Sequence, residues 1–225
     1  MSEELKVVLS DGRAVSALLD RPRDAWLLYV LAHGAGAGMR HRFLESMSRV
    51  LADHGVATFR YQFPYMEAGS RRPDPPTKAE AAVRAAVQQA ISVMPGLPVI
   101  AGGKSFGGRM TSGAAAESLP GVRGLGFLGF PLHPPGKPGT SRADHLDKVQ
   151  LPMLFLQGTR DQFAQLTLIT EVCERLGSRA TLHLIDDADH SFSVPARSGR
   201  STSSVLEELA TTLVQWARSF LGAGG

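Results

Sequence analysis

A glycine-bounded serine between an apolar run and an alanine-rich run constrains this chain more than any other stretch. Residues 102–108 read G-G-K-S-F-G-G, the apolar residues 98–101 precede them, and a helical pattern over 109–117 follows. G-x-S-x-G between a strand and a helix is typical of a strained turn that projects the hydroxyl of Ser105 beyond the strand. Gly103 and Gly107 flank the serine because a Cβ at either position would crowd the turn.

The same letters are also compatible with an ordinary glycine-rich turn, and they imitate the end of a phosphate-binding loop. A phosphate loop, G-x-x-x-x-G-K-S/T, needs a glycine at position 98, where this chain has Pro98. The phosphate loop is therefore disfavoured. The choice between a plain turn and a nucleophile depends on what the rest of the chain supplies.

Composition limits the classes of protein that the chain can belong to. With 225 residues and 43% hydrophobic content, residues 1–225 are expected to form one domain. The net charge is only +3 and the longest basic run is Arg71-Arg72, so no nucleic-acid partner is expected. The longest apolar run, residues 25–32, is too short to span a bilayer, and no signal-peptide pattern follows Met1. Together with the single cysteine, Cys173, the short apolar run and the missing signal-peptide pattern predict a cytoplasmic protein without a membrane partner.

Strand and helix patterns alternate along the chain, which predicts an α/β fold with a mostly parallel sheet and helices on both faces. About eight strands are expected, the first two as an antiparallel hairpin: residues 5–9, 15–19, 26–32, 56–60, 98–101, 124–130, 153–157 and 181–185. The expected helices are residues 42–54, 78–93, 109–117, 166–176 and 201–221. The proline-rich residues 62–77 are expected to form an irregular loop.

Candidate partners for the serine follow later strands in the chain. A serine hydroxyl needs a base, and the base needs an orienting carboxylate, in the chain order serine, acid, histidine for this type of sheet. Asp161 follows the strand predicted at 153–157, and His190 follows the strand predicted at 181–185. Taken alone, Asp161 also fits a helix cap and His190 a loop histidine. The rival residues near strand ends are Asp186, Asp187 and Asp189 for the acid and His133 for the base.

Acyl transfer also needs hydrogen-bond donors for the oxyanion that develops on the substrate. One expected donor is the backbone N–H of Phe106, the residue after the nucleophile. The second is expected from the glycine-rich loop after the strand at 26–32, where the N–H of Ala35 is favoured and that of Gly36 is the alternative. His33 in this loop is expected to be a structural anchor.

The sequence also offers candidates for the residues that line the substrate pocket around the serine. Met39, Tyr65 and His133 are the expected substrate-binding residues; other candidate pocket walls are Tyr61, Phe63, Met66, Phe106, Leu132 and Phe163. Residues 131–151 are too few for a helical cap, so an open site without a cap domain is expected. Six basic residues near the strand ends are compatible with a positive rim that favours anionic acyl substrates, and equally with an ordinary solvated face: Arg40, Arg60, Lys104, Arg109, Lys137 and Arg142. No ligand cluster points to a metal or a cofactor.

The chain resembles the α/β-hydrolase superfamily over nearly its full length, and within it the small, lidless, dienelactone-hydrolase-like proteins. More narrowly, it is similar to a family that includes a testis-expressed protein and a subunit of the NSL histone-acetyltransferase complex. The blocks that carry this are H-G-A-G-A-G-M, F-R-Y-Q-F-P-Y-M-E, G-G-K-S-F-G-G-R-M, F-P-L-H-P-P-G-K-P and Q-G-T-R-D. The resemblance implies the α/β-hydrolase fold and a triad of Ser105, Asp161 and His190. Dienelactone hydrolase itself has a cysteine nucleophile, so the serine here puts that substrate in doubt.

Two classes of function follow. The first is a serine hydrolase, esterase-like, that acts on a small-molecule ester, thioester or related acyl compound through an acyl-enzyme. The second is a non-catalytic interaction protein that retains the fold. The complete set of triad residues favours the hydrolase, because an abandoned site would be expected to lose its members. The sequence predicts neither the substrate nor the oligomeric state.

Overall fold

A twisted sheet of eight strands forms the centre of the molecule, in a computed structural model that describes residues 2–222. The strand order is β1-β2-β4-β3-β5-β6-β7-β8. β1 and β2 pair antiparallel, as does β2 with β4, and every other neighbouring pair is parallel. The strands are β1 Glu3–Val8, β2 Ala14–Asp20, β3 Leu27–Ala32, β4 Val56–Tyr61, β5 Val99–Lys104, β6 Val122–Leu128, β7 Met153–Gly158 and β8 Ala180–Ile185.

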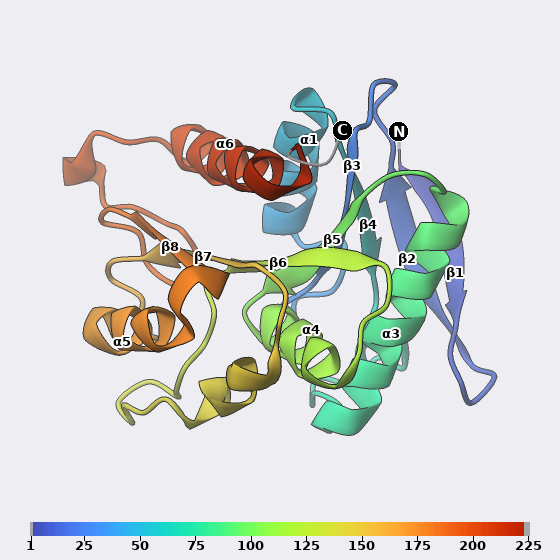
Figure 1. The fold of residues 1–225 in the computed structure, drawn as a ribbon, viewed down its shortest axis with the longest axis horizontal. Helices are drawn as coiled ribbons and strands as arrows, with labels where there is room; N and C mark the ends of the chain where they lie inside the picture. Colours follow the sequence, from blue (N-terminus) through green and yellow to red (C-terminus); the bar gives the residue numbers. More distant parts are fainter. Residues whose placement is uncertain (1, 223–225) are drawn as a thin grey trace.

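Helices cover both faces of this sheet (Figure 1). α1 (Arg42–Asp53) and α6 (Thr202–Leu221) pack on one face. α3 (Pro76–Val93), α4 (Phe106–Glu117) and α5 (Leu166–Leu176) pack on the other. The remaining short elements are the helix α2 (Pro64–Glu67) and the 3-10 helices η1 (Ser141–Lys148), η2 (Gly177–Arg179) and η3 (Ala196–Ser198). The predicted architecture, including the opening hairpin, is therefore confirmed.

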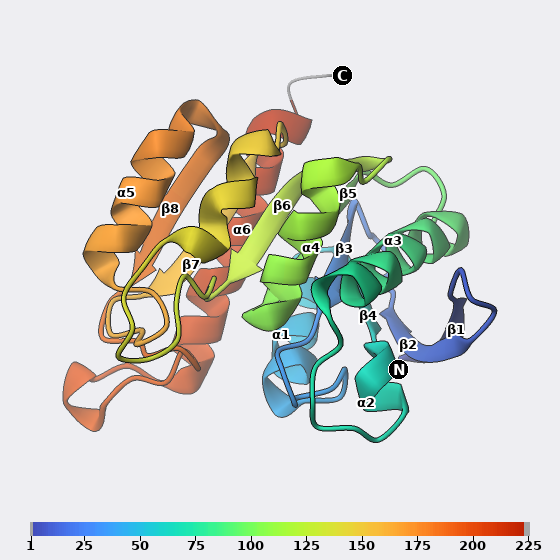
Figure 2. The same ribbon diagram turned by 90° about the horizontal axis from the view of Figure 1, so that it is seen from below.

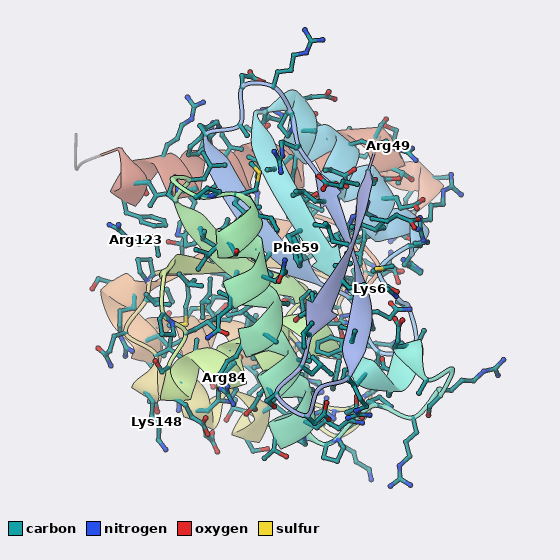
Figure 3. The ribbon with its side chains drawn as sticks, turned by 90° about the vertical axis from the view of Figure 1, so that its right-hand side faces the viewer. Lys6, Arg49, Phe59, Arg84, Arg123 and Lys148 are labelled. Atoms are coloured by element: carbon teal, nitrogen blue, oxygen red, sulfur yellow. The ribbon has the colours of Figure 1, made fainter. Side chains whose placement is uncertain are left out.

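Burial explains why β3 is a continuous apolar run, and β4 is buried as well although it contains Thr58 and Arg60. All six residues of β3 and of β4 are buried, as expected for parallel strands with helices on both faces. Figure 3 looks at the molecule from its side and shows Phe59 of β4 among the strands, whereas the charged Arg49 and Arg123 lie at the periphery. The two apolar layers fix the sheet rigidly, so the loops at its end are held on a stable support.

The prediction of an irregular loop over residues 62–77 is wrong at both ends. α2 begins at Pro64, and α3 begins at Pro76 rather than at residue 78. Proline fits the first helical turn because its φ is already helical and its missing N–H has no acceptor there. Asp74 stabilises the connection, since its Oδ2 accepts the backbone N–H of Tyr65 at 2.8 Å. Other boundaries differ by a few residues: the helix after the serine begins at Phe106, β5 spans Val99–Lys104 instead of 98–101, and β6 spans Val122–Leu128 instead of 124–130.

The carboxyl ends of the parallel strands lie together along one end of the sheet. In Figure 2 the loops that follow β3, β4 and β8 lie along the lower side of the molecule. Between β6 and β7 the chain forms a loop and the 3-10 helix η1, and no cap covers this end within residues 2–222. The fold without a cap domain that the sequence predicts is therefore confirmed. Every predicted triad residue lies in or beside a loop at this end of the sheet.

Candidate active site

The turn between β5 and α4 holds Ser105 in a strained conformation. Its φ is 51° and its ψ is −114°, a region that residues with a side chain rarely adopt. A Cβ at Gly103 would lie 2.4 Å from the carbonyl oxygen of Ala32, and one at Gly107 would lie 2.6 Å from that of His33. The sharp turn therefore requires both glycines, as the sequence predicted. The backbone strain therefore lies at Ser105, the residue whose hydroxyl the turn exposes.

Three side chains from three different loops form one hydrogen-bonded chain. The Oγ of Ser105 lies 2.8 Å from Nε2 of His190, and Nδ1 of His190 lies 2.7 Å from Oδ2 of Asp161. Asp161 is 5% exposed, so its carboxylate is shielded from water and directed at the imidazole. With Nδ1–H donated to Asp161, Nε2 is free to accept the hydroxyl proton of Ser105. The structure thus brings together the three residues that the sequence predicted as a triad.

The carboxylate of Asp161 is fixed by two further donors. Oδ1 accepts the backbone N–H of Phe163 at 2.7 Å, and Oδ2 accepts Nε2–H of Gln157 at 2.5 Å. Gln157 is fully buried in β7, and its Oε1 accepts the backbone N–H of Phe130 at 2.9 Å. This second bond settles which end of the amide faces Asp161. Asp161 does not cap α5, whose N-cap is Gln165.

Sequence reasoning missed Gln157, although it opens the Q-G-T-R-D block. A polar residue at the end of an otherwise apolar strand was the available signal. Since its amide ties Asp161 to the backbone after β6, we interpret it as a residue that positions the carboxylate.

Removing this amide is expected to affect both rate and stability. Gln157→Leu should lower kcat by up to about 100-fold, because a misplaced carboxylate misplaces His190. The substitution should also lower the free energy of unfolding by about 1–3 kcal/mol, because the N–H of Phe130 loses its buried acceptor. Gln157→Glu keeps that acceptor but sets a carboxylate against Asp161, and like charges raise the pKa of such a pair. The acid limb of the pH–rate profile should then move upward, whereas a purely structural role would leave the profile in place.

The rival triad candidates have other partners. The Nδ1 of His133 lies 2.9 Å from the carbonyl oxygen of Pro134, and its Nε2 accepts the N–H of Gln165 at 3.1 Å. Oδ1 of Asp189 accepts the N–H groups of Ser191 and Ser193, at 2.8 and 3.0 Å. His133 thus ties two loops together, and Asp189 shapes the loop that carries the imidazole. Neither makes the contacts expected of the base or the acid.

The glycine-rich loop after β3 is held by His33. The buried ring of His33 faces the carbonyl of Gly34 with Nδ1 at 2.8 Å, and its Nε2 accepts the N–H of Phe63 at 3.1 Å. Burial lowers the pKa of this imidazole to about 4, so it stays neutral at neutral pH. His33 therefore anchors the loop, as expected, and does not serve as a base.

Hydrogen bonding distinguishes the two candidates for the second oxyanion donor. The N–H of Gly36 donates to the hydroxyl of Tyr65 at 3.0 Å. Within residues 2–222, the N–H groups of Ala35 and Phe106 donate to no protein acceptor, and Ala35 borders the space beside Ser105. The geometry thus favours Ala35 over Gly36.

A hollow of about 300 Å³ opens beside the serine. Its walls come from the loop after β3, the start of α1, the end of β5 and the loops that carry Asp161 and His190: Gly34, Ala35, Ala37, His41, Phe43, Leu44, Lys104, Ser105, Phe163, His190 and Ser191. Of the predicted pocket walls, Phe163 lies here; the centre of its ring is 4.3 Å from that of His190, and the two ring planes are inclined by 38°. The hollow is apolar on the side of α1 and polar next to the serine.

None of the predicted substrate-binding residues, Met39, Tyr65 and His133, lines this hollow, so their placement is corrected. Met39 borders a separate depression beside β1. The hydroxyl of Tyr65 is turned to the N–H of Gly36, and His133 bridges two loops. The sequence signal that placed them was proximity to strand ends, which does not determine where a side chain points. Phe43 and Leu44, which do line the hollow, carried no signal beyond helical periodicity.

In the described residues, no three His, Cys, Asp or Glu side chains gather in an arrangement suited to a metal ion. Also within this part of the chain, every helix is too short or too polar to cross a bilayer.

Comparison with known proteins gives one family and many similar structures. Residues 25–218 match the model of a family described as an alpha/beta hydrolase domain. Similar solved structures include a dienelactone hydrolase from Anabaena variabilis, with 21% identity, 97% coverage of both chains and a TM-score of 0.77. A serine hydrolase without a lid from Xanthomonas campestris shares 20% identity over 96% of this chain and 94% of its own, with a TM-score of 0.75. An esterase domain from Rhodothermus marinus shares 20% identity over 97% and 98%, with a TM-score of 0.71.

Proposed function

Because the chain belongs to the alpha/beta hydrolase domain family, we propose that it is a serine hydrolase acting on a small ester, thioester or related acyl compound. The observation that carries this proposal is the hydrogen-bonded chain from Ser105 through His190 to Asp161, built on a strained turn. The similar serine hydrolase and esterase structures support it, as they have the same fold.

The proposed reaction proceeds through an acyl-enzyme. The Oγ of Ser105 attacks the carbonyl carbon while its proton passes to Nε2 of His190, and Asp161 stabilises the imidazolium. The N–H groups of Phe106 and Ala35 donate to the oxyanion of the tetrahedral intermediate. Collapse of this intermediate breaks the bond to the alcohol or thiol, which leaves with the proton from His190. Water, deprotonated by His190, then attacks the acyl group and releases the acid and the serine hydroxyl.

The alternative proposal is a non-catalytic interaction protein, suggested by the narrower sequence resemblance to a histone-acetyltransferase complex subunit. That narrower kinship rests on the sequence blocks alone. The aligned triad favours the hydrolase, because strain at Ser105 and a buried carboxylate both cost stability and serve no purpose in a scaffold.

A fluorophosphonate probe tests the proposal directly. Such a probe reacts covalently with a serine whose hydroxyl is activated, and it does not require knowledge of the substrate. Labelling of the protein at Ser105 is the expected outcome. A protein that is folded but not labelled would support the interaction protein instead.

The hollow also predicts a preference for short or compact acyl groups. Each methylene contributes about 0.8 kcal/mol only where an apolar wall receives it, and a hollow of about 300 Å³ without a cap offers little such wall. In a series of p-nitrophenyl esters, kcat/KM should therefore stop rising before about eight carbons. A continued rise with longer chains would contradict the predicted absence of a deep acyl tunnel.

A further inference from the structure

One basic residue, Lys104, borders the proposed active site. Lys104 is the last residue of β5, directly before Ser105, and it lines the hollow with His190. Its Nζ lies 5.5 Å from the centre of the Phe192 ring. A Cβ built on Gly129 would be 3.1 Å from this Nζ and 3.5 Å from the ring of His190. The ammonium and the catalytic imidazole thus both lie beside Gly129, and the imidazole also lines the hollow.

Of the basic residues of the predicted rim, Lys104 lines the hollow and the other five do not. Unlike Arg60 and Arg40, it also has no ion-pair partner within residues 2–222. Arg60 pairs with Asp20 at 2.7 Å, and Arg40 pairs with Glu4. Within residues 2–222, no carboxylate oxygen lies within 4.0 Å of Nζ of Lys104, and no protein atom accepts a hydrogen bond from it. Asp161 and Asp189 attract this ammonium only at longer range. The face of the Phe192 ring attracts this ammonium but leaves its N–H donors without an acceptor, and a carboxylate would supply that acceptor.

We propose that Lys104 makes this hydrolase selective for acyl compounds that carry a carboxylate on the group occupying the hollow. The inference rests on the hydrolase function proposed above and names its substrate class. Phe43, Leu44 and Phe163 provide apolar walls in the same hollow. The preferred substrate therefore has a short apolar body between the scissile bond and a terminal carboxylate.

The preference for a carboxylate over a neutral amide should weaken at high pH, because it requires Lys104 to be charged. Burial lowers the pKa of Lys104 to about 8, and the attraction of Asp161 and Asp189 opposes this effect. His190 and His41 also face the hollow, and they are the other titratable groups there. Lys104 is thus charged below about pH 8 and loses its charge as the pH rises through that value. The selectivity should be constant below this pH and decline above it, because kcat/KM reports the ionisation of the free enzyme.

Matched pairs of esters test the proposal. The first pair is the mono-p-nitrophenyl ester of adipic acid and the p-nitrophenyl ester of adipic monoamide, which differ by a carboxylate in place of a neutral amide. Shorter diacids are avoided because their carboxylate expels p-nitrophenolate without an enzyme. The second pair carries the carboxylate or the carboxamide on the leaving phenol of a hexanoate ester. In at least one pair, wild type should favour the carboxylate by about 10- to 100-fold in kcat/KM.

Three variants assign that preference to one side chain. Lys104→Met should reduce the ratio to near unity while the amide ester is still hydrolysed. Lys104→Arg should retain the preference and abolish its decline above about pH 8, since arginine stays charged. Lys137→Met, which removes an exposed lysine of the loop after β6, is the control for general surface charge and should leave the ratio unchanged. Melting temperature and fluorophosphonate labelling establish that each variant is folded and active.

Several results would overturn the inference and leave the proposed function intact. One is hydrolysis of both members of each pair at equal rates by wild type. Another is an equal loss for both members in Lys104→Met with a shifted acid limb, which would mean that Lys104 acts through His190. If wild type hydrolyses none of the four esters and is not labelled by fluorophosphonate, the proposed hydrolase itself fails.

Discussion

Ser105→Ala is expected to lower the turnover of an activated ester by roughly a million-fold and to abolish labelling by fluorophosphonates. The physical reason is that no other hydroxyl can take its place at 2.8 Å from Nε2 of His190 on a turn fixed by two glycines. The residual rate would come from the oxyanion donors and the hollow, which the variant leaves in place. Labelling is read by intact mass, and turnover by release of p-nitrophenolate.

A matched control separates the nucleophile from the other serines of the chain. Ser118→Ala removes an exposed hydroxyl at the far end of α4, the helix that Ser105 precedes. This variant should be labelled and should turn over like wild type. Equal labelling of wild type and Ser105→Ala would assign the reaction to another residue and would contradict the proposed mechanism.

Asp161→Asn should lower turnover by roughly four orders of magnitude, as the equivalent change does in a serine protease. Oδ2 of Asp161 accepts from both His190 and Gln157. An amide NH₂ at that place would meet the NH₂ of Gln157, whose orientation is fixed by its bond to Phe130. It would also favour the imidazole tautomer that carries its proton on Nε2. That tautomer cannot accept the proton of Ser105, so the loss appears in kcat.

Stability distinguishes this effect from unfolding. In Asp161→Asn the amide oxygen of the new side chain can still accept the N–H of Phe163, whereas the NH₂ of Gln157 loses its acceptor, so this variant should lose about 1–3 kcal/mol of stability. Asp161→Ala loses the bond from Phe163 as well and should therefore be less stable than Asp161→Asn. The expected pattern is thus a similar loss of rate in both variants, with the larger loss of stability in the second.

Asp187→Asn and Asp189→Asn are the controls for a misassigned acid. Asp189 accepts two backbone N–H groups of its own loop and lies outside the contact with His190. An asparagine oxygen can accept the same bonds, so turnover should fall far less than in Asp161→Asn. If activity survived in Asp161→Asn and disappeared in either control, the carboxylate of the triad would have been chosen wrongly.

The sequence by itself determined the sheet and the three residues of the proposed triad. Parallel strands buried on both faces are mostly apolar, so they can be located as runs, and their carboxyl ends share one edge. Ser105, Asp161 and His190 each follow such a run, so they were placed at that edge before any distance was known. The glycines around Ser105 added the strained turn, because their spacing reflects a backbone too close to its neighbours for a Cβ.

Only the tertiary structure decided what lies around those residues, since side-chain direction depends on contacts between loops that are distant in sequence. The hydroxyl of Tyr65 accepts the N–H of Gly36, while the N–H of Ala35 has no protein acceptor within residues 2–222. Met39 and His133 lie near strand ends, yet they do not line the hollow, whereas Phe43 of α1 does. The unpaired state of Lys104 depends on the absence of a carboxylate within reach in the described chain, a property of the folded packing that no local pattern records.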